Sequence, residues 1–333
     1  MKIGFIMSHP VFAPTNGVVS QAYTWKKGLE QLGHDVVLVN MWDRNDWKSF
    51  DVLHFFGFSV YMAEFIQVVH HINANIAISP ILDPNYSITN LKLRSYWGNR
   101  KLNLMNPFYA LRKIKPFIKW IFVRSKYEQE YMMKGFGFEK KKCPIVPLSY
   151  GIDLPNDKYT KESFCLHISL LCDERKNVKR LIEAAKKYKF KLILGGKLRN
   201  EEEKRTLESW MADNKYVEYR GFLSLDEMKE LYSRARVFAL PSIVEGVGIV
   251  ALEAAVYGCD IVVTEKGGPH EYYKDMAITV NPHSVDDIGR AIIQYLSGLT
   301  HQPKLQQFAI EHYSLVAIAQ QILDVYMSEY PKP

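Results

Sequence analysis

The sequence predicts an α/β protein built from two doubly wound domains. Short apolar runs rich in β-branched residues alternate with longer segments of helical period along most of the chain. This alternation is typical of βαβ units with parallel sheets. Near-continuous apolar runs such as residues 261–263 are typical of strands covered on both faces. The length of 333 residues also favours two domains, at roughly 100–200 residues per domain.

The N-terminal half contains the first series of alternating elements. The predicted strands are 3–7, 35–40, 52–56, 76–81, 120–123 and 144–148, and the predicted helices are 18–32 and 59–71. Each strand is a short apolar run, and each helix has apolar residues at intervals of three and four. Gly33 closes the first helix.

The C-terminal half repeats the alternation. The predicted strands are 164–171, 191–194, 216–219, 237–240 and 260–264, and the predicted helices are 178–187, 201–212, 225–235 and 248–257. Turn formers at 149–161 mark a boundary, so we expect an N-terminal domain at 1–150 and a C-terminal domain at 151–313. Residues 305–330 read as one or two amphipathic helices without a strand partner. In such domain pairs a ligand sits outside the carboxyl ends of the strands, at the cleft between the domains.

Composition excludes several classes of protein. With 47% hydrophobic and 24% charged residues, the chain is neither disordered nor fibrous. The four cysteines form no CxxC pair, which disfavours a structural zinc site and suits a reducing compartment. Residues 1–10 show no signal-peptide pattern, and the apolar stretch 54–69 is too short to span a bilayer. We therefore expect a cytosolic protein.

The net charge of +7 is concentrated in one segment. Residues 92–142 contain fourteen Lys and Arg against three acids, a balance of +11, so the rest of the chain carries −4. Aromatic and aliphatic side chains alternate with these cations, as in helices that bind anionic lipid surfaces. The alternatives are an amphipathic helix packed on its own sheet with a solvated basic face, and a nucleic-acid surface, which no recognised module supports.

The stretch 241–271 (PSIVEGVGIVALEAAVYGCDIVVTEKGGPHE) carries the most chemical information. A strand there runs through a loop into a helix whose N-terminus favours an anion such as a phosphate. Glycines in the turns let backbone N–H groups approach a ligand closely, and two carboxylates suit neighbouring sugar hydroxyls. The residues concerned are Glu245, Gly246, Gly248, Glu253, Gly267, Gly268 and Glu271. For any one of them the alternative is a glycine-capped turn with solvated acids.

This stretch resembles the group 1 (family 4) retaining glycosyltransferases of the GT-B fold, whose pattern is PSxxEGxGxxxLEAxAxGxPVV followed by a glycine pair and an acid. The matching positions are Pro241, Ser242, Glu245, Gly246, Gly248, Leu252, Glu253, Ala254, Gly258, Val262, Val263, Gly267, Gly268 and Glu271. Seven residues separate the two glutamates, the spacing typical of that family. Weaker matches at 15–18, 51–54, 124–125, 150–153, 220–224 and 236–242 extend the resemblance over nearly the whole chain.

The resemblance implies two Rossmann-like domains facing a central cleft, with a C-terminal helix at about 314–333 crossing back to the N-terminal domain. It implies that Glu245 contacts the donor sugar and stabilises an oxocarbenium-like transition state, and that Glu253 binds the ribose of the nucleotide. Lys176 would neutralise the donor diphosphate, where charge develops on the leaving group. The remaining implied donor-binding positions are Asn16, Gly17, Arg175, Phe222, Leu223, Gly246, Val247, Gly248, Ile249, Gly267 and Gly268.

Three positions depart from the family pattern. Leu171 stands where the family usually has an arginine, so Arg175 takes over or the diphosphate is held differently. Val247 replaces a common aromatic. The histidine that often contacts the donor sugar has no clear equivalent, and Asp83 is the first catalytic candidate for its place. His54 and His9 are further candidates, although a lone histidine near a strand end is more often structural.

No D-x-D triplet occurs in the chain, so we expect binding of the donor without a metal ion, by Lys176, helix termini and glycine amides. The family is generally thought to react on one face of the sugar, with the donor phosphate assisting deprotonation of the acceptor. A covalent double displacement would instead need a carboxylate on the opposite face of the sugar.

We therefore expect a retaining, metal-independent glycosyltransferase that uses a UDP- or GDP-linked sugar as co-substrate and no other cofactor. Its acceptor would be a glycolipid, lipopolysaccharide or polysaccharide at the cytosolic face of the membrane. The residues assigned to the acceptor or an anionic membrane surface are Arg94, Trp97, Arg100, Lys101, Arg112, Lys113, Lys115 and Lys119. The alternatives are another GT-B enzyme, such as an epimerase or phosphorylase, and a non-catalytic GT-B partner subunit.

Overall fold

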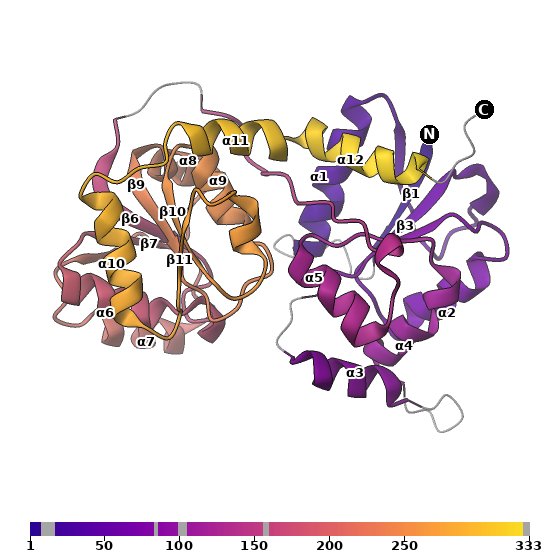
Figure 1. The fold of residues 1–333 in the computed structure, drawn as a ribbon, viewed down its shortest axis with the longest axis horizontal. Coiled ribbons are helices and arrows are strands. Elements are labelled where there is room, and N and C mark those ends of the chain that lie inside the picture. Colours follow the sequence, from indigo (N-terminus) through magenta and orange to yellow (C-terminus); the bar gives the residue numbers. More distant parts are fainter. Residues whose placement is uncertain (8–16, 83–85, 99–104, 156–159, 329–333) are drawn as a thin grey trace. The chain divides into compact units, whose positions relative to one another are not determined.

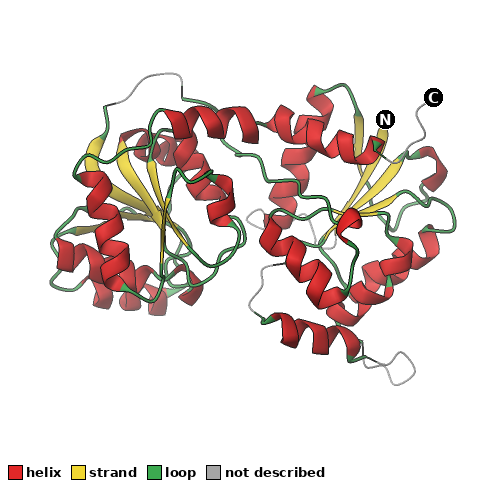
Figure 2. Ribbon diagram, viewed as in Figure 1, coloured by secondary structure: helices red, strands yellow, loops and turns green. Residues whose placement is uncertain are grey.

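A computed structural model describes residues 1–7, 17–82, 86–98, 105–155 and 160–328. The chain divides into two compact units, Met1–Ser149 with Tyr313–Pro333, and Tyr150–His312. We call them unit 1 and unit 2. Each unit is a parallel sheet with helices on its two faces (Figures 1 and 2).

The sheet of unit 1 has five parallel strands in the order β2-β1-β3-β4-β5. The strands are β1 (Lys2–Met7), β2 (Asp35–Leu38), β3 (Val52–Phe56), β4 (Ile76–Ser79) and β5 (Trp120–Ile121). The helices are α1 (Gly17–Gln31), α2 (Val60–Val69), α3 (Ile88–Tyr96), α4 (Pro107–Lys113), α5 (Lys126–Glu130) and α12 (Leu315–Met327).

The two faces of this sheet are buried by different helices. Side chains alternate along β3, so that Leu53 and Phe55 join the core beneath α2 and α4. His54 lies on the opposite face, beside Trp25 of α1 and Tyr326 of α12. The C-terminal helix α12 is therefore part of the core of unit 1, and it packs so closely on α1 that a Cβ on Gly28 would lie 2.6 Å from the Leu315 carbonyl oxygen.

One strand predicted in unit 1 is absent. Within residues 105–155, the segment 144–148 forms only an isolated bridge between Val123 and Ile145 and no strand. Pro144 and Pro147 have no N–H to donate to a ladder, which explains why an apolar run fails to extend the sheet here.

The sheet of unit 2 has six parallel strands in the order β11-β10-β9-β6-β7-β8. The strands are β6 (Glu162–Ile168), β7 (Leu192–Gly195), β8 (Val217–Tyr219), β9 (Ala235–Leu240), β10 (Asp260–Thr264) and β11 (Ile278–Val280). The helices are α6 (Val178–Tyr188), α7 (Glu201–Met211), α8 (Leu225–Arg234), α9 (Ile249–Val256), α10 (Val285–Leu296) and α11 (Lys304–Tyr313).

Two elements of unit 2 were not predicted, the short strand β11 and the helix α10. Helix α10 begins after Ser284, whose hydroxyl accepts a hydrogen bond from the Asp287 N–H, and two acids in its first turn suit the helix dipole. Its buried residues join one core with α6 and the neighbouring face of the sheet. The fold of unit 2 is thus a complete doubly wound sheet.

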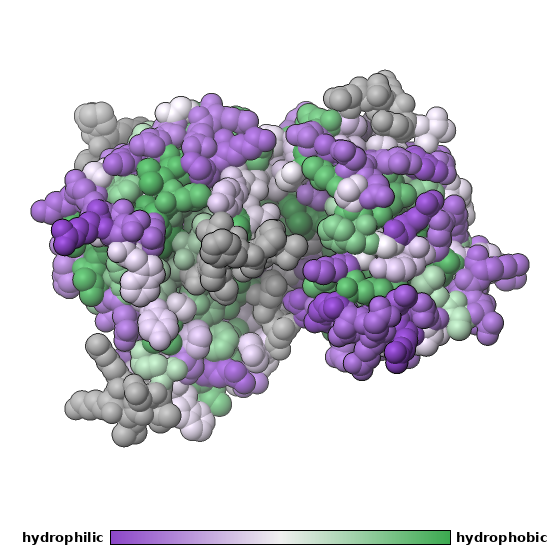
Figure 3. Space-filling model, turned by 180° about the vertical axis from the view of Figure 1, so that it is seen from behind, coloured by the Kyte–Doolittle hydropathy of each residue, from purple (hydrophilic) through white to green (hydrophobic). Residues whose placement is uncertain are grey.

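Among the described residues, no helix combines the length and the apolar character needed to cross a bilayer. On the face drawn in Figure 3, hydrophilic side chains separate the apolar patches from one another.

Candidate active site

The candidate site of unit 2 lies where the order of its strands reverses. From β6 the chain proceeds to β7 and β8 on one side of the sheet, and to β9, β10 and β11 on the other. Ligands of open α/β sheets bind outside the carboxyl ends of the strands at such a reversal. Lys176 follows β6 and Glu245 follows β9, so the two residues belong to the two strands that flank the reversal.

The two side chains form an ion pair. The Lys176 ammonium nitrogen lies 2.5 Å from Glu245 Oε2, and the side chains are only 19% and 10% exposed. The Ser242 hydroxyl donates to the same carboxylate oxygen at 3.1 Å, and the Gly246 N–H donates to the other at 3.2 Å. Glu245 is thus held by three donors. Sequence reasoning assigned no role to Ser242, although it lies three residues before Glu245.

Glycine at position 267 allows the Glu245 backbone to take this position. The Glu245 N–H donates to the Lys266 carbonyl, and the Gly268 N–H donates to the Glu245 carbonyl, both at 3.2 Å. Gly267 has a φ of +106°, and a Cβ there would lie 1.9 Å from the Glu245 carbonyl oxygen. Only glycine fits, because the loops after β9 and β10 touch backbone to backbone. The second glycine motif therefore positions Glu245.

Lys176 lies in a short 3₁₀ turn, Glu174–Lys176, just before α6. Asn177 follows with a φ of 59° and separates the turn from the helix. The buried Asn177 amide donates to the carbonyls of Pro241 and Pro282, at 2.9 and 2.7 Å. This side chain ties the lysine loop to the glutamate loop, and sequence reasoning missed it because its partners are 64 and 105 residues away.

Glu253 lies on α9, and its side chain is partly buried. Burial raises the pKa of its carboxyl group to about 7, although the Gly151 N–H and the Tyr232 hydroxyl favour the charged form. The buried Tyr232 hydroxyl is close enough to affect Glu253, yet it forms no hydrogen bond of ordinary geometry within the described residues. Because a carboxylate accepts hydrogen bonds from hydroxyl groups, Glu253 suits a ligand with vicinal hydroxyls.

The predicted donor-binding side chains do not all point to one site. Arg175 is paired with Asp173, at 3.1 Å, within its own turn. Val247 and Leu223 are buried, so they can offer a ligand only their backbones, whereas Phe222 is 71% exposed. Gly248 has a φ of +74° and caps α9, with Ile249 as the first residue of that helix.

Leu171, which replaces the family arginine, is fully buried in the core of unit 2. Its side chain therefore takes no part in holding a ligand. Among the described cations of this loop, Lys176 is the one paired with Glu245.

His54 is not a catalytic residue in this structure, and its assignment as a candidate is corrected. The ring is fully buried in unit 1, with Nδ1 2.5 Å from the Tyr326 hydroxyl and Nε2 2.8 Å from the Ser79 hydroxyl. Burial lowers the pKa of the ring to about 3. A neutral ring with both nitrogens bonded in the core has no access to a substrate.

The other unit 1 candidates are only partly described. Gly17 is exposed at the start of α1, after the strand at which the order of this sheet reverses. Four predicted residues, as well as His9, lie outside the described residues: Asn16, Asp83, Arg100 and Lys101.

The described residues of the basic segment lie on α3, on α4 and just beyond. Arg94 and Trp97 are exposed at the end of α3, and the Arg94 guanidinium stacks on the Tyr86 ring. Lys119 lies apart from the others, donating to the Asn75 side chain at 3.1 Å. Arg112, Lys113 and Lys115 line one pocket. Among the described residues, no group of three or more His, Cys, Asp or Glu is arranged to hold a metal ion.

Comparison with known proteins matches unit 2 to a known family. Residues 155–312 match the sequence profile described as "Glycosyl transferases group 1". This match covers less than half of the chain. The O-antigen chain mannosyltransferase B of Escherichia coli is 28% identical over 148 residues, which cover 40% of this chain and 37% of that enzyme. The matches to the first curated relatives span between 19% and 37% of the length of those proteins.

Solved structures share the fold of the whole chain. A glycosyltransferase from Rickettsia africae ESF-5 has a TM-score of 0.74 at 15% identity, over 98% of both chains. Anabaena HepE, solved in complex with UDP, has a TM-score of 0.71 at 16% identity, over 98% of this chain and 100% of that one. These likenesses and the group 1 profile confirm the predicted family resemblance and the GT-B fold.

Proposed function

We propose that the chain is a retaining glycosyltransferase that moves a sugar from a nucleotide-diphosphate donor to a glycan or lipid-linked acceptor without a metal ion. The observation that carries this proposal is the ion pair between Lys176 and Glu245 at the strand-order reversal of unit 2. A cation, glycine amides and a carboxylate at one place match the needs of a diphosphate and a reacting sugar.

The donor half of the proposal assigns a role to each of three residues. Lys176 would bind the diphosphate and offset the charge that develops as the nucleotide leaves. Glu245, released from the ion pair, would accept hydrogen bonds from the donor sugar and stabilise positive charge at the anomeric carbon. Glu253 would hold the ribose hydroxyls. UDP, which is bound by the HepE neighbour, and GDP are the nucleotides to test first.

Retention follows in this proposal from a reaction on one face of the sugar. The acceptor hydroxyl would attack the same face of the sugar from which the donor phosphate departs, and the phosphate would assist deprotonation of that hydroxyl. A double displacement would require a carboxylate on the opposite face, placed as a nucleophile. The product would then keep the anomeric configuration of the donor.

The acceptor half rests on the relatives and on the charge of unit 1. The O-antigen mannosyltransferase name supports a cell-envelope glycan as the acceptor class. The +11 balance of residues 92–142 and the exposed side chains of α3 support a peripheral position on the cytosolic face of an anionic membrane.

One observation supports a second candidate function, that of a non-catalytic GT-B partner subunit. Leu171 is buried where the family carries an arginine, so the donor diphosphate meets one cation fewer. A non-catalytic subunit would bind no donor, or would bind it without turnover, and binding and turnover therefore need separate measurements.

A thermal-shift panel of UDP- and GDP-linked sugars, with and without EDTA, tests the proposal. A ligand at about 100 times its Kd stabilises a protein by about 2.7 kcal/mol. We expect one donor to raise the melting temperature equally with and without EDTA, and Lys176→Ala to abolish the shift. Release of nucleoside diphosphate from that donor then separates an enzyme from a binding subunit. The absence of a shift with every donor would reject the proposal.

A further inference from the structure

The inference concerns an open, basic pocket in unit 1 of about 420 Å³. It lies between α3, α4 and the turns that follow α4 and α5. Its lining residues are Ser95, Tyr96, Arg112, Lys113, Lys115, Pro116, Phe136 and Gly137. Its volume falls within the range of about 300–1,000 Å³ that small-ligand sites usually have.

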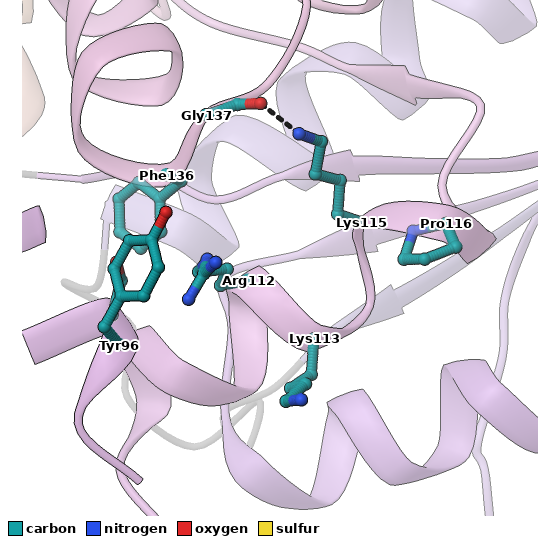
Figure 4. A pocket seen from close by; sticks show the side chains of 8 residues that line it. Tyr96, Arg112, Lys113, Lys115, Pro116, Phe136 and Gly137 are labelled. Carbon is teal, nitrogen blue, oxygen red and sulfur yellow. Dashed lines mark hydrogen bonds between the residues drawn. The ribbon is translucent and has the colours of Figure 1, made fainter.

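The lining combines cations with an aromatic wall (Figure 4). The Arg112 guanidinium lies over the Tyr96 ring, and the Lys115 ammonium donates to the Gly137 carbonyl. Phe136 backs the pocket from the core, because its side chain is buried. The ring of Tyr96 orients the guanidinium, and Lys115 keeps further N–H donors beyond the one given to Gly137.

The acids of the basic segment form their ion pairs outside this pocket. Its three acids are each paired with a cation elsewhere, Glu128 with Arg124, Glu130 with Lys134 and Glu139 with Lys141. Lys141 above all, and also Lys142 and Lys115, lower the pKa of the Glu139 carboxyl group, so this acid lies within electrostatic reach of the pocket cation Lys115. Among the described residues, no carboxylate forms an ion pair with a pocket cation. Three of the fourteen cations of residues 92–142 therefore line a space that a ligand can enter: Arg112, Lys113 and Lys115.

Exposed apolar side chains lie beside the pocket. At the end of α3, Leu93 is 56% exposed, Tyr96 is 57% exposed and Trp97 is 71% exposed. Aromatic side chains next to cations are what a protein uses at the headgroup level of a bilayer. A free phosphorylated metabolite would not account for apolar side chains left in water around the site.

We propose that this pocket binds the phosphate group of an anionic lipid headgroup. Arg112 would hold two phosphate oxygens with its guanidinium, Lys113 and Lys115 would add charge, and Leu93, Tyr96 and Trp97 would enter the interface. The inference refines the membrane position in the proposed function, on which it rests. It assigns membrane binding to one defined phosphate site and not to diffuse electrostatic attraction between the basic segment and the membrane.

Paired variants test the site. Arg112→Ala/Lys113→Ala removes two pocket charges, and Lys140→Ala/Lys141→Ala removes two exposed charges from the same segment. The assay is co-sedimentation with phosphatidylcholine vesicles containing about 30 mol% phosphatidylglycerol, and with phosphatidylcholine alone. We expect the wild-type protein to bind the anionic vesicles only, and the pocket variant to lose at least about tenfold more affinity than the control variant.

Each other result overturns the inference. Equal losses in the two variants would mean diffuse attraction, and equal binding to both vesicles would mean apolar insertion alone. Binding of soluble glycerol phosphate without binding of vesicles would mean a soluble ligand. A nucleotide-sugar thermal shift on the same preparations reports on unit 2 separately, so failure of the lipid site and failure of the proposed donor site are distinguishable.

Discussion

Replacing Gly267 by alanine tests whether the backbone contact between two loops positions Glu245. The new Cβ would lie 1.9 Å from the Glu245 carbonyl oxygen, whereas Cβ contacts under 3.0 Å essentially never occur. The loops must therefore separate by at least about 1 Å, a displacement that can cost about 10²-fold in rate when it reaches a catalytic group. That factor corresponds to about 2.7 kcal/mol of transition-state stabilisation.

Gly298→Ala is the matched control. Gly298 has a φ of +118°, close to the +106° of Gly267, but nothing lies within 4 Å of its Cβ position. Both variants carry backbone strain of about 1–3 kcal/mol, which lowers the melting temperature by a few degrees. Only Gly267→Ala also moves Glu245.

The assay is release of nucleoside diphosphate from the selected donor, well below both melting temperatures. We expect Gly298→Ala to keep the wild-type kcat/KM and Gly267→Ala to lose about 10²-fold. If the two variants retain similar activity, the position of Glu245 does not matter to the reaction and the reasoning is refuted.

Three further predictions concern pH and helix packing. Burial raises the pKa of Glu253 to about 7, so its carboxylate forms as the pH rises through 7. Because the carboxylate accepts hydrogen bonds from the ribose, nucleotide affinity measured by calorimetry should rise from pH 6 to pH 8. Glu253→Gln should abolish that rise. Burial lowers the pKa of His54 from 6.5 to about 3, so below about pH 6 the unfolded state binds a proton that the folded state does not. In urea titrations, the free energy of unfolding of unit 1 should therefore fall by about 1.4 kcal/mol per pH unit below about pH 6 because of His54. His54→Gln should remove that part of the pH dependence. A Cβ on Gly28 would lie 2.6 Å from the Leu315 carbonyl oxygen, so Gly28→Ala should lower the free energy of unfolding by about 1–3 kcal/mol while the exposed control Ser20→Ala stays near wild type.

Local sequence patterns predicted the parts of the fold that depend on neighbouring residues. Apolar runs located most strands, and strand β9, its glycine loop and helix α9 were predicted together from the stretch around Glu245. The pattern failed at 144–148, where composition favours a strand but two prolines remove the donors that a ladder needs.

Contacts between residues distant in sequence were not predictable in this way. His54 was a catalytic candidate because the family histidine that contacts the donor sugar has no clear equivalent in the sequence. Its partner Tyr326 lies 272 residues away on the returning helix. The Lys176 turn depends on Asn177, whose αL backbone and remote carbonyl partners leave no periodic signal. The spacing of Glu245 and Glu253 identified the candidate site, but it did not predict the ion pair between Lys176 and Glu245.

The central claim is that Glu245 acts on a sugar bound from a nucleotide donor. The most direct measurement compares nucleoside diphosphate release by the wild-type protein and by Glu245→Gln, with the same donor and acceptor and with melting temperatures recorded for both. We expect the variant to remain folded and to lose at least about 10²-fold in kcat. Equal rates in the two proteins would contradict the claim.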